Sequence, residues 1–299
     1  MAATYSSTTV DLSSLPAPTI VEQMAFDDIL DLMISRVQLL LPTFDATVDS
    51  DPEVKVLQVA AYLVMLIRQQ FNDAAQQLMV AYATGDRLDH LGALVGVARL
   101  TLVPAKSQTG AAAVFEGDDS YRQRIVLAPE GFSVAGPELA YVKHAKDASG
   151  DVLDASATSP APGEVLVSVL SRLGNGTASP DLIAAVRAVV TDPAIRPLGD
   201  LVTVAPAQLV EFAILARLTT FSGPDVNVVL AAAQTALASY LAKNRLLGRS
   251  INRAGIIAAL TVPGVENVEL EAPAADVACT LTQVANATSI TVTHAGFAS

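Results

Sequence analysis

The stretch from residue 52 to about residue 80 constrains the fold of this 299-residue chain more than any other feature. Pro52 suits the first position of a helix, Ser50 or Asp51 can cap it, and Glu53 adds an acid to the first turn. Apolar residues then recur at spacings of three and four, which predicts one long helix. This seam, interrupted only by Arg68, consists of Val54, Leu57, Ala61, Val64, Phe71, Ala75, Leu78 and Tyr82.

A second apolar stripe runs beside that seam and consists of Val56, Ala60, Leu63, Ile67 and Ala74. A surface helix usually buries one stripe about 100° wide, so this helix needs neighbours on two sides. Those neighbours belong either to a helical module of the same chain or to a bundle completed by another chain. For the second case, the predicted partner interface comprises Val54, Leu57, Ala61, Val64, Ile67, Phe71, Ala75, Leu78 and Tyr82.

Two further helices flank the long one. Residues 26 to 41 form an amphipathic pattern with Asp27 and Asp28 in the first turn, and a short helix is predicted from 86 to about 94. Residues 1 to 20 are rich in Ser, Thr and Pro and are predicted to form an extended arm that needs a partner to become ordered. We therefore predict a helical module over residues 21 to 100.

From residue 101 the hydrophobic period changes to two, which predicts strands joined by turns. Alternating stretches at 111–117, 124–136 and 139–145 make residues 101 to 163 a β-rich domain, with Asp118 and Asp119 in a turn or loop. Strands and helices then alternate: strand 164–171, helix 181–190, strands 201–204 and 209–219, and helix 225–246.

The two helices of that alternation begin alike. Ser179-Pro180-Asp181 and Gly223-Pro224-Asp225 each supply a cap, a proline and an acid, and their spacing of 44 residues predicts two related β-α units. We predict an α+β domain over 164–262, including a short helix at 253–260, and a C-terminal β segment over 263–299. That segment holds alternating stretches at 265–271, 276–283 and 289–293. The fold class is thus α+β multidomain: an N-terminal helical bundle module, a middle β-rich domain, and a C-terminal α/β domain with a β tail.

The composition excludes several classes of protein. With 52% hydrophobic and 16% charged residues, the chain is not intrinsically disordered as a whole. It has no uncharged apolar run of about 18 residues, so we predict no membrane span and infer that much of its apolar surface is buried against other chains. A net charge of -12 disfavours general binding to nucleic acid or to anionic membranes.

The charges are unevenly distributed along the chain. Residues 1 to 53 hold nine acids and one base, whereas residues 226 to 265 hold no acid. The two regions are either ordinary solvated faces or complementary surfaces that meet between subunits. The candidate inter-subunit charge patch in the second region consists of Lys243, Arg245, Arg249 and Arg253.

Residues capable of chemistry are few and dispersed. His90, His144 and His294 show no metal-binding or catalytic spacing, and the single Cys279 excludes an intramolecular disulfide and predicts a buried thiol. The segment GNGTAS at 174–179 resembles part of a dinucleotide-binding loop but lacks the third small residue and the acid after the next strand. We predict a plain turn, with Ser179 as a helix cap, and no catalytic residue, cofactor or metal site.

Several strings, in order along nearly the whole chain, carry a family resemblance. They resemble the baseplate assembly protein J family, the wedge proteins of the tail baseplate in contractile-tailed phages and related injection systems. The sequence departs from the family pattern locally, at 117–124, before FSVAGP. The strings are DSDPEVK at 49–55, RQQFNDAA at 68–75, AYATGDRLDHLGALVGVARL at 81–100, FSVAGPELAYVKHA at 132–145, SPAPGEVLVSVLSR at 159–172 and VPGVENVEL at 262–270.

The resemblance implies a structural protein without catalytic activity. It implies two copies of the chain per wedge beside one smaller tail protein, and a ring of six wedges that contacts the sheath initiator and the hub and spike and relays the trigger for sheath contraction. The N-terminal helices would bundle with the partner, which places residues 51 to 82 in a wedge bundle. The implied location is the virion tail baseplate, after assembly in the host cytoplasm.

Two alternatives from other classes remain open. The first is an enzyme that binds a phosphate or nucleotide with the 174–179 loop, which requires a pocket with convergent polar groups beside it. The second is a tail adhesin, which usually presents exposed aromatic residues. The chain has no Trp and only 5% aromatic residues, which disfavours the adhesin.

Overall fold

A computed structural model describes residue 12 and residues 15–45, 48–105, 110–133, 135–223 and 225–298. Most of the predicted arm at 1–20 therefore lies outside the described residues. The chain forms two compact units, which we call the helical unit and the sheet unit. Among the described residues, the helical unit comprises those from 12 to 98 and from 118 to 125, and the sheet unit comprises those from 99 to 117 and from 126 to 298.

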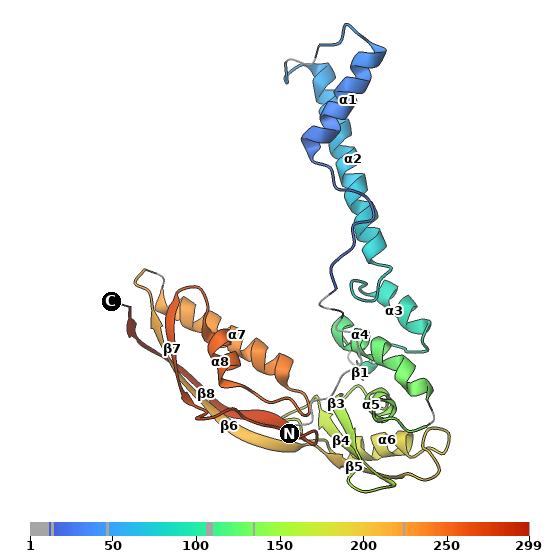
Figure 1. Cartoon of the computed structure of the whole chain (residues 1–299), viewed down its shortest axis with the longest axis vertical. Helices are drawn as coiled ribbons and strands as arrows, with labels where there is room; N and C mark the ends of the chain where they lie inside the picture. The colour runs from blue at the N-terminus through green and yellow to red at the C-terminus, as the bar shows by residue number, and fades with distance from the viewer. Residues whose placement is uncertain are drawn as a thin grey trace. The chain divides into compact units, whose positions relative to one another are not determined.

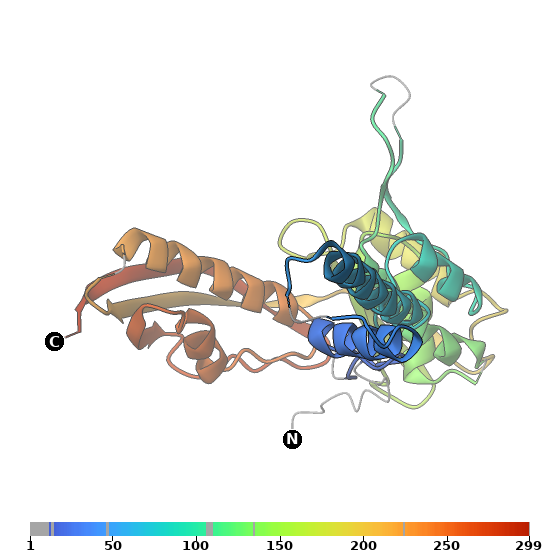
Figure 2. The ribbon, with the colours of Figure 1, turned by 90° about the horizontal axis from the view of Figure 1, so that it is seen from above.

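The helical unit is built around α2 (Pro52–Gln76), with α1 (Phe26–Leu40) packed along it (Figures 1 and 2). Both helices confirm the sequence prediction, and Pro52 occupies the first turn of α2 as expected. The third predicted helix is α3 (Asp86–Ala93). The long helix ends at Gln76 rather than near residue 80, because the chain then tightens into successive turns, beginning with a hydrogen bond from Leu78 N to the Ala75 carbonyl.

Two polar residues of α2, Arg68 and Asn72, hold the segment that precedes α1. The buried Asn72 accepts hydrogen bonds at Oδ1 from the N–H groups of Ile20 and Val21, at 3.0 and 2.8 Å, and donates Nδ2 to the Val21 carbonyl. Arg68 Nε donates to the Glu22 carbonyl at 3.2 Å. The polar interruption of the predicted seam is thus a binding site for the chain's own backbone.

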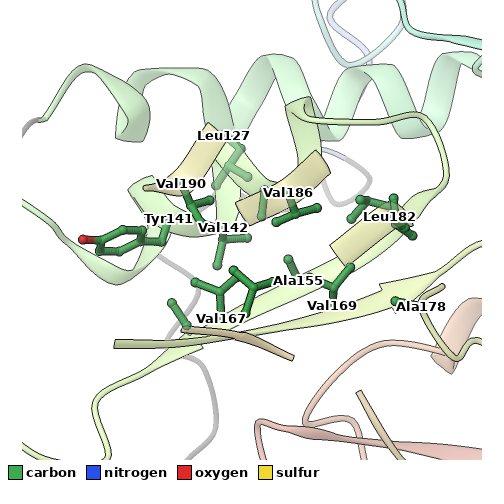
Figure 3. Close-up of a cluster of buried hydrophobic side chains, with 14 residues drawn as sticks. Leu127, Tyr141, Val142, Ala155, Val167, Val169, Ala178, Leu182, Val186 and Val190 are labelled. Carbon is green, nitrogen blue, oxygen red and sulfur yellow. The ribbon is translucent and has the colours of Figure 1, made fainter. Parts of the chain in front are cut away.

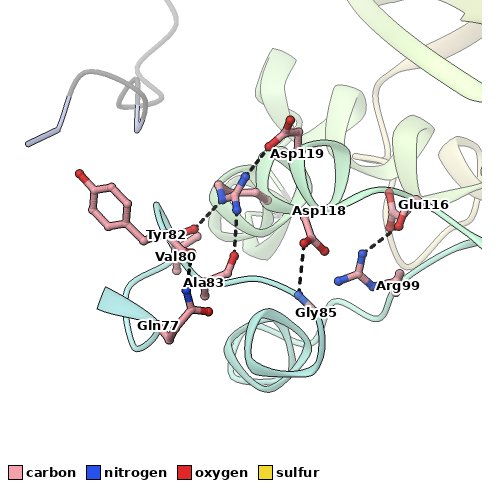
Figure 4. A network of polar contacts seen from close by, with 10 residues as sticks. Gln77, Val80, Tyr82, Ala83, Gly85, Arg99, Glu116, Asp118 and Asp119 are labelled. Carbon is pink, nitrogen blue, oxygen red and sulfur yellow. Dashed lines mark hydrogen bonds and ion pairs between the residues drawn. The ribbon is translucent and has the colours of Figure 1, made fainter. Parts of the chain in front are cut away.

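The end of the helical unit is tied together by α4 (Asp118–Leu127) (Figure 4). Arg122 donates to the carbonyls of Val80 and Ala83, at 2.7 and 2.8 Å, and pairs with Asp119 at 2.6 Å. Asp118 accepts from the N–H of Gly85. The prediction that residues 118 and 119 lie in a turn is therefore wrong: they form the first turn of α4, where the helix dipole favours acids.

The strands predicted at 124–136 and 139–145 are also wrong. The first stretch continues α4 into the 3-10 helix η2 (Ala128–Phe132), and the second lies in α5 (Glu138–Asp147). In both stretches the short apolar runs are compatible with the two-residue period of a strand and with the 3.6-residue period of a helix. The residues that are buried in the structure follow the helical period. Buried residues recur at helical spacings of three and four at Tyr121, Arg124, Ile125 and Ala128, and at Tyr141, Val142 and Ala145.

The first sheet of the sheet unit has the order β3-β4-β5, with β3 (Val152–Thr158), β4 (Glu164–Ser171) and β5 (Leu201–Pro206). β4 runs antiparallel to β3 and parallel to β5, and α6 (Pro180–Val190) connects β4 to β5. Side chains of α5 and α6 pack on the sheet in one hydrophobic core (Figure 3). The predicted boundary at 163/164 falls between the paired strands β3 and β4, because β3 is not evident in the sequence pattern.

A short antiparallel pair, β1 (Thr101–Val103) and β2 (Val114–Phe115), precedes α4. The middle region predicted to be β-rich therefore contains helices as well as strands. The α+β class itself holds, since helices and sheets alternate through the described residues.

The second sheet has the order β7-β6-β8, with β6 (Gln208–Thr220), β7 (Val265–Ala272) and β8 (Gln283–Phe297). β6 runs antiparallel to β7 and parallel to β8. Two helices, α7 (Val226–Asn244) and α8 (Arg253–Leu260), pack their buried side chains against the alternate residues of β6 that point inward. Each sheet thus has a central strand followed by a helix, in agreement with the two predicted β-α units.

Three details of this sheet correct the sequence analysis. Residues 276 to 282 form no strand and contribute one isolated bridge, from Ile251 to Val277. The predicted boundary at 262/263 falls inside the sheet, because β7 and β8 pair with β6 from the preceding segment. The cap of α7 is Asp225, whose carboxylate accepts from Asn227 N, rather than Gly223, and residue 224 lies outside the described residues.

Candidate interaction surface

The nine residues of the predicted partner interface do not share one environment. Val54 and Ala61 are buried within the helical unit, whereas the exposed fractions of Ile67, Phe71 and Leu78 are 50%, 62% and 75%. The others, Leu57, Val64, Ala75 and Tyr82, are half-buried.

Helix geometry explains this division. Residues seven apart drift by about 20° per heptad around a straight α-helix. Leu57, Val64 and Phe71 are seven apart, and they pass from half-buried to exposed along α2. Over the same length the buried side of α2 becomes polar, at Arg68 and Asn72. The part of the predicted seam that lies in α2 is therefore one line on the helix that crosses from its inner to its outer side, and Leu78 and Tyr82 lie beyond the end of the helix.

The outer side of α2 carries a continuous apolar surface, which we call the free apolar stripe. It consists of Val56, Ala60, Leu63, Ile67, Phe71 and Ala74. Its large members, Val56, Leu63, Ile67 and Phe71, are 50 to 68% exposed. Exposed apolar patches of this kind mark interaction sites. The stripe therefore leaves one side of α2 open for a further helix.

Helix α1 also carries exposed apolar residues, which the sequence pattern did not single out. Leu32, Leu39 and Leu40 are 64 to 72% exposed. The available signal was the position of Leu32 and Leu39 outside the main apolar face of that helix. Long apolar side chains in water carry a free-energy cost that burial against a partner removes.

The four basic residues of the candidate charge patch also differ in their environments. Arg245 donates Nη2 to the Gly174 carbonyl at 2.9 Å, and Arg253 donates Nη2 to the Leu270 carbonyl at 2.9 Å. Lys243 and Arg249 are exposed. Two of the four cations therefore bind backbone carbonyls of their own chain rather than lying free on a common surface.

The 174–179 loop uses its polar groups internally. Asn175 Oδ1 accepts from Thr177 N at 3.1 Å, and Ser179 Oγ accepts from Leu182 N at 3.2 Å, which confirms Ser179 as the cap of α6. The φ angle of Gly176 is +103°, and a Cβ there would lie 2.6 Å from a Leu170 methyl carbon. The loop is a tight turn packed on β4, as predicted.

Replacing Ser179 by alanine is expected to lower the free energy of unfolding of the sheet unit by about 0.5–2 kcal/mol, the usual value of an N-cap. Denaturant titration of the full chain measures this change. Asn175→Ala serves as a comparison that leaves the cap intact. Both variants should assemble normally, and loss of particle activity without loss of stability would instead support a ligand in the loop.

Of the titratable groups with shifted pKa values, Tyr141 and His144 lie in α5, and Cys279 lies between β7 and β8. Burial, with the hydrogen bond to Asp200 at 2.8 Å, raises the pKa of Tyr141 in α5. Burial also lowers the pKa of His144 and raises that of Cys279, whose burial the sequence predicted. His90 is exposed and His294 contacts Thr220 at 3.1 Å. Across the described ranges no cluster of three or more His, Cys, Asp or Glu residues could hold a metal ion.

Comparison with known proteins shows the family of the chain. Baseplate protein J of Escherichia phage P2 is 42% identical over 296 residues, covering 96% of this chain and 98% of its own length. The chain belongs to the baseplate J family. The family's N-terminal, central and C-terminal domain models match residues 49–106, 133–206 and 212–293. The free apolar stripe of this baseplate J protein thus lies within the N-terminal match.

A solved structure gives a weaker match. A chain of the anti-feeding prophage baseplate, determined by cryo-EM with six-fold symmetry, is 15% identical with a TM-score of 0.40. The match covers 59% of this baseplate J chain and 43% of that chain.

Within the described part of the molecule, each helix is too short or too polar to cross a bilayer. As a baseplate J homologue, the chain is a structural protein of a phage-tail baseplate.

Proposed function

We propose that the chain is a wedge subunit that forms the baseplate ring around the central hub and relays the trigger for sheath contraction. The observation that carries the proposal is the free apolar stripe of α2, together with membership of the baseplate J family. Burying each large side chain of the stripe contributes about 1.5–3 kcal/mol relative to full exposure. Helices from other chains, packed along α2, provide that burial.

In the proposed assembly, two copies of this chain join one smaller tail protein in each wedge. Six wedges close the ring, which contacts the sheath initiator and the hub and spike. The chain acts in the virion tail baseplate after assembly in the host cytoplasm, and needs no cofactor and no nucleic acid. The 174–179 loop supports this structural role over a phosphate-binding enzyme, because its polar groups bond to backbone N–H groups and to the Arg245 guanidinium of the same chain.

Co-expression with the neighbouring small tail protein tests the proposal. We expect the isolated chain to self-associate through its exposed stripe. With the small protein present, native mass spectrometry should detect a discrete complex with two copies of the 31.0 kDa chain and one of the partner. A stable, folded monomer that ignores the small protein at micromolar concentration would contradict the wedge assignment.

A further inference from the structure

Strand β8 is an unusually unprotected sheet edge. It is 15 residues long and pairs, among the described strands, only with β6. Exposed edge strands are normally protected by charges, prolines or bulges. β8 holds no Asp, Glu, Lys, Arg or Pro, and its two register shifts leave a regular stretch from Ser289 to His294 between them. Ile290 is 47% exposed, and its neighbours Ser289 and Thr291 are exposed as well. Such an edge is a template for a further strand.

The hydrogen bonds between β6 and β8 determine which backbone N–H and C=O groups of β8 remain available to a further strand. At the two ends of the β6–β8 ladder, Gln208 N donates to the Thr282 carbonyl and the Thr220 carbonyl accepts from Ala298 N. The even-numbered residues of β6 therefore direct their backbone N–H and C=O groups towards β8. In a parallel ladder, the residue paired with such a position turns its own N–H and C=O to the opposite side. Between the two register shifts these partners are Ile290, Val292 and His294.

We propose that β8 pairs antiparallel with β8 of a second copy of this chain, about a two-fold axis at Thr291. In this register Ile290 and Val292 of a second copy exchange N–H···O=C bonds through their outward groups. Thr291 faces its own equivalent in a pair without backbone hydrogen bonds, and Ser289 faces Thr293 of the second copy. The result is one continuous six-stranded sheet.

The side chains match in this register. Ile290 meets Val292, which is 8% exposed in the single chain, so the apolar pairs extend the core under α7. Ser289, Thr291 and Thr293 form hydroxyl pairs on the other face, and such cross-strand pairs stabilise sheets. A two-fold contact requires a self-complementary surface, and this strand provides one.

Electrostatics favours a second copy on β8 over one on the opposite edge. The chain carries a net charge of -12, so most identical surfaces repel each other. β8 is uncharged apart from His294 and brings no like charges together. The other edge, β7, carries Glu266, Glu269 and Glu271. Arg217 of β6 pairs with Glu269 and Glu271, and the net negative charge that remains on this edge disfavours self-pairing. The proposed contact extends the wedge assembly but is separate from the α2 stripe.

A disulfide test reports this register directly. In the full chain with Cys279→Ala, Thr291→Cys should form a disulfide-linked dimer under mild oxidation, because directly opposed Cβ atoms lie about 4.5–5.5 Å apart. Thr293→Cys is the matched control: it faces Ser289 and should stay unlinked. Equal linking at both positions, no linking at either, or linking only when another tail protein is added would each overturn the proposal.

A charge substitution provides an independent measurement. The measurement uses a chain that also carries Ile67→Ala and Phe71→Ala, which removes self-association through the α2 stripe. In this chain, Thr291→Lys places two like charges opposite each other and should shift the sedimentation equilibrium towards monomer, whereas the β-branched Thr291→Val should not. Residue 291 is exposed, so neither change should unfold the sheet unit. An unchanged equilibrium in Thr291→Lys would contradict β8 pairing. Variants of the α2 stripe should still form the Thr291→Cys disulfide, so failure of the wedge proposal and failure of this one are distinguishable.

Discussion

Replacing Ile67 and Phe71 together by alanine should lower the affinity of the chain for its wedge partner by at least about tenfold. Both side chains are half or more exposed in the single chain, so their truncation removes contacts made only in the complex. Burial from complete exposure contributes about 1.5–3 kcal/mol per side chain, and about half of that remains to be gained for each of these residues, so the pair contributes roughly 1.5–3 kcal/mol. Each 1.4 kcal/mol corresponds to about a tenfold change in affinity. Isothermal titration calorimetry with the small tail protein measures the loss.

Two comparisons separate this effect from unfolding. Gln69→Ala changes an exposed polar residue on the same helix and should leave the affinity unchanged. Val54→Ala changes a buried residue and should lower the stability of the helical unit, while the stripe itself stays intact. If the Ile67 and Phe71 double variant binds the partner as tightly as the unchanged chain, the free apolar stripe is not the wedge interface.

Replacing Gly92 by alanine should strongly destabilise the helical unit. Gly92 lies buried in α3, where an added Cβ would overlap the Tyr121 hydroxyl and lie 2.9 Å from the Val97 carbonyl oxygen. Tyr121 is 1% exposed and donates to that carbonyl at 2.7 Å, so it cannot move without breaking a buried hydrogen bond. Overpacking costs about 1–3 kcal/mol, and an unsatisfied buried polar group costs about 1–3 kcal/mol more.

Thermal unfolding monitored by circular dichroism tests this expectation, together with limited proteolysis of residues 15–98. Gly117→Ala provides the control, since an added Cβ there would meet no described atom within 4 Å and the φ angle of Gly117 is not in the left-handed region. We expect the control to stay within about 0.5 kcal/mol of the unchanged chain. Equal stability of the two variants would mean that α3 and α4 do not pack as described.

The sequence determined those features that depend on local signals. Pro52 at the start of α2 and Ser179 before α6 mark helix starts, because capping and proline effects act within one turn. Long stretches with a clear period were also read correctly, including α1, α7 and the strands β4 and β6. The strings that resemble the baseplate J family predicted the family that the comparison then established.

The tertiary structure decided everything that depends on which segments meet. Short apolar stretches such as 139–145 fit either period, and burial against β3 made that stretch helical. The boundaries at 163/164 and 262/263 divide sheets, because strand pairing joins residues far apart in sequence. The side of α2 that stays open was set by α1 and by the segment held at Asn72. A helical period fixes which residues share a face, but only the packed neighbours determine which face remains exposed to water.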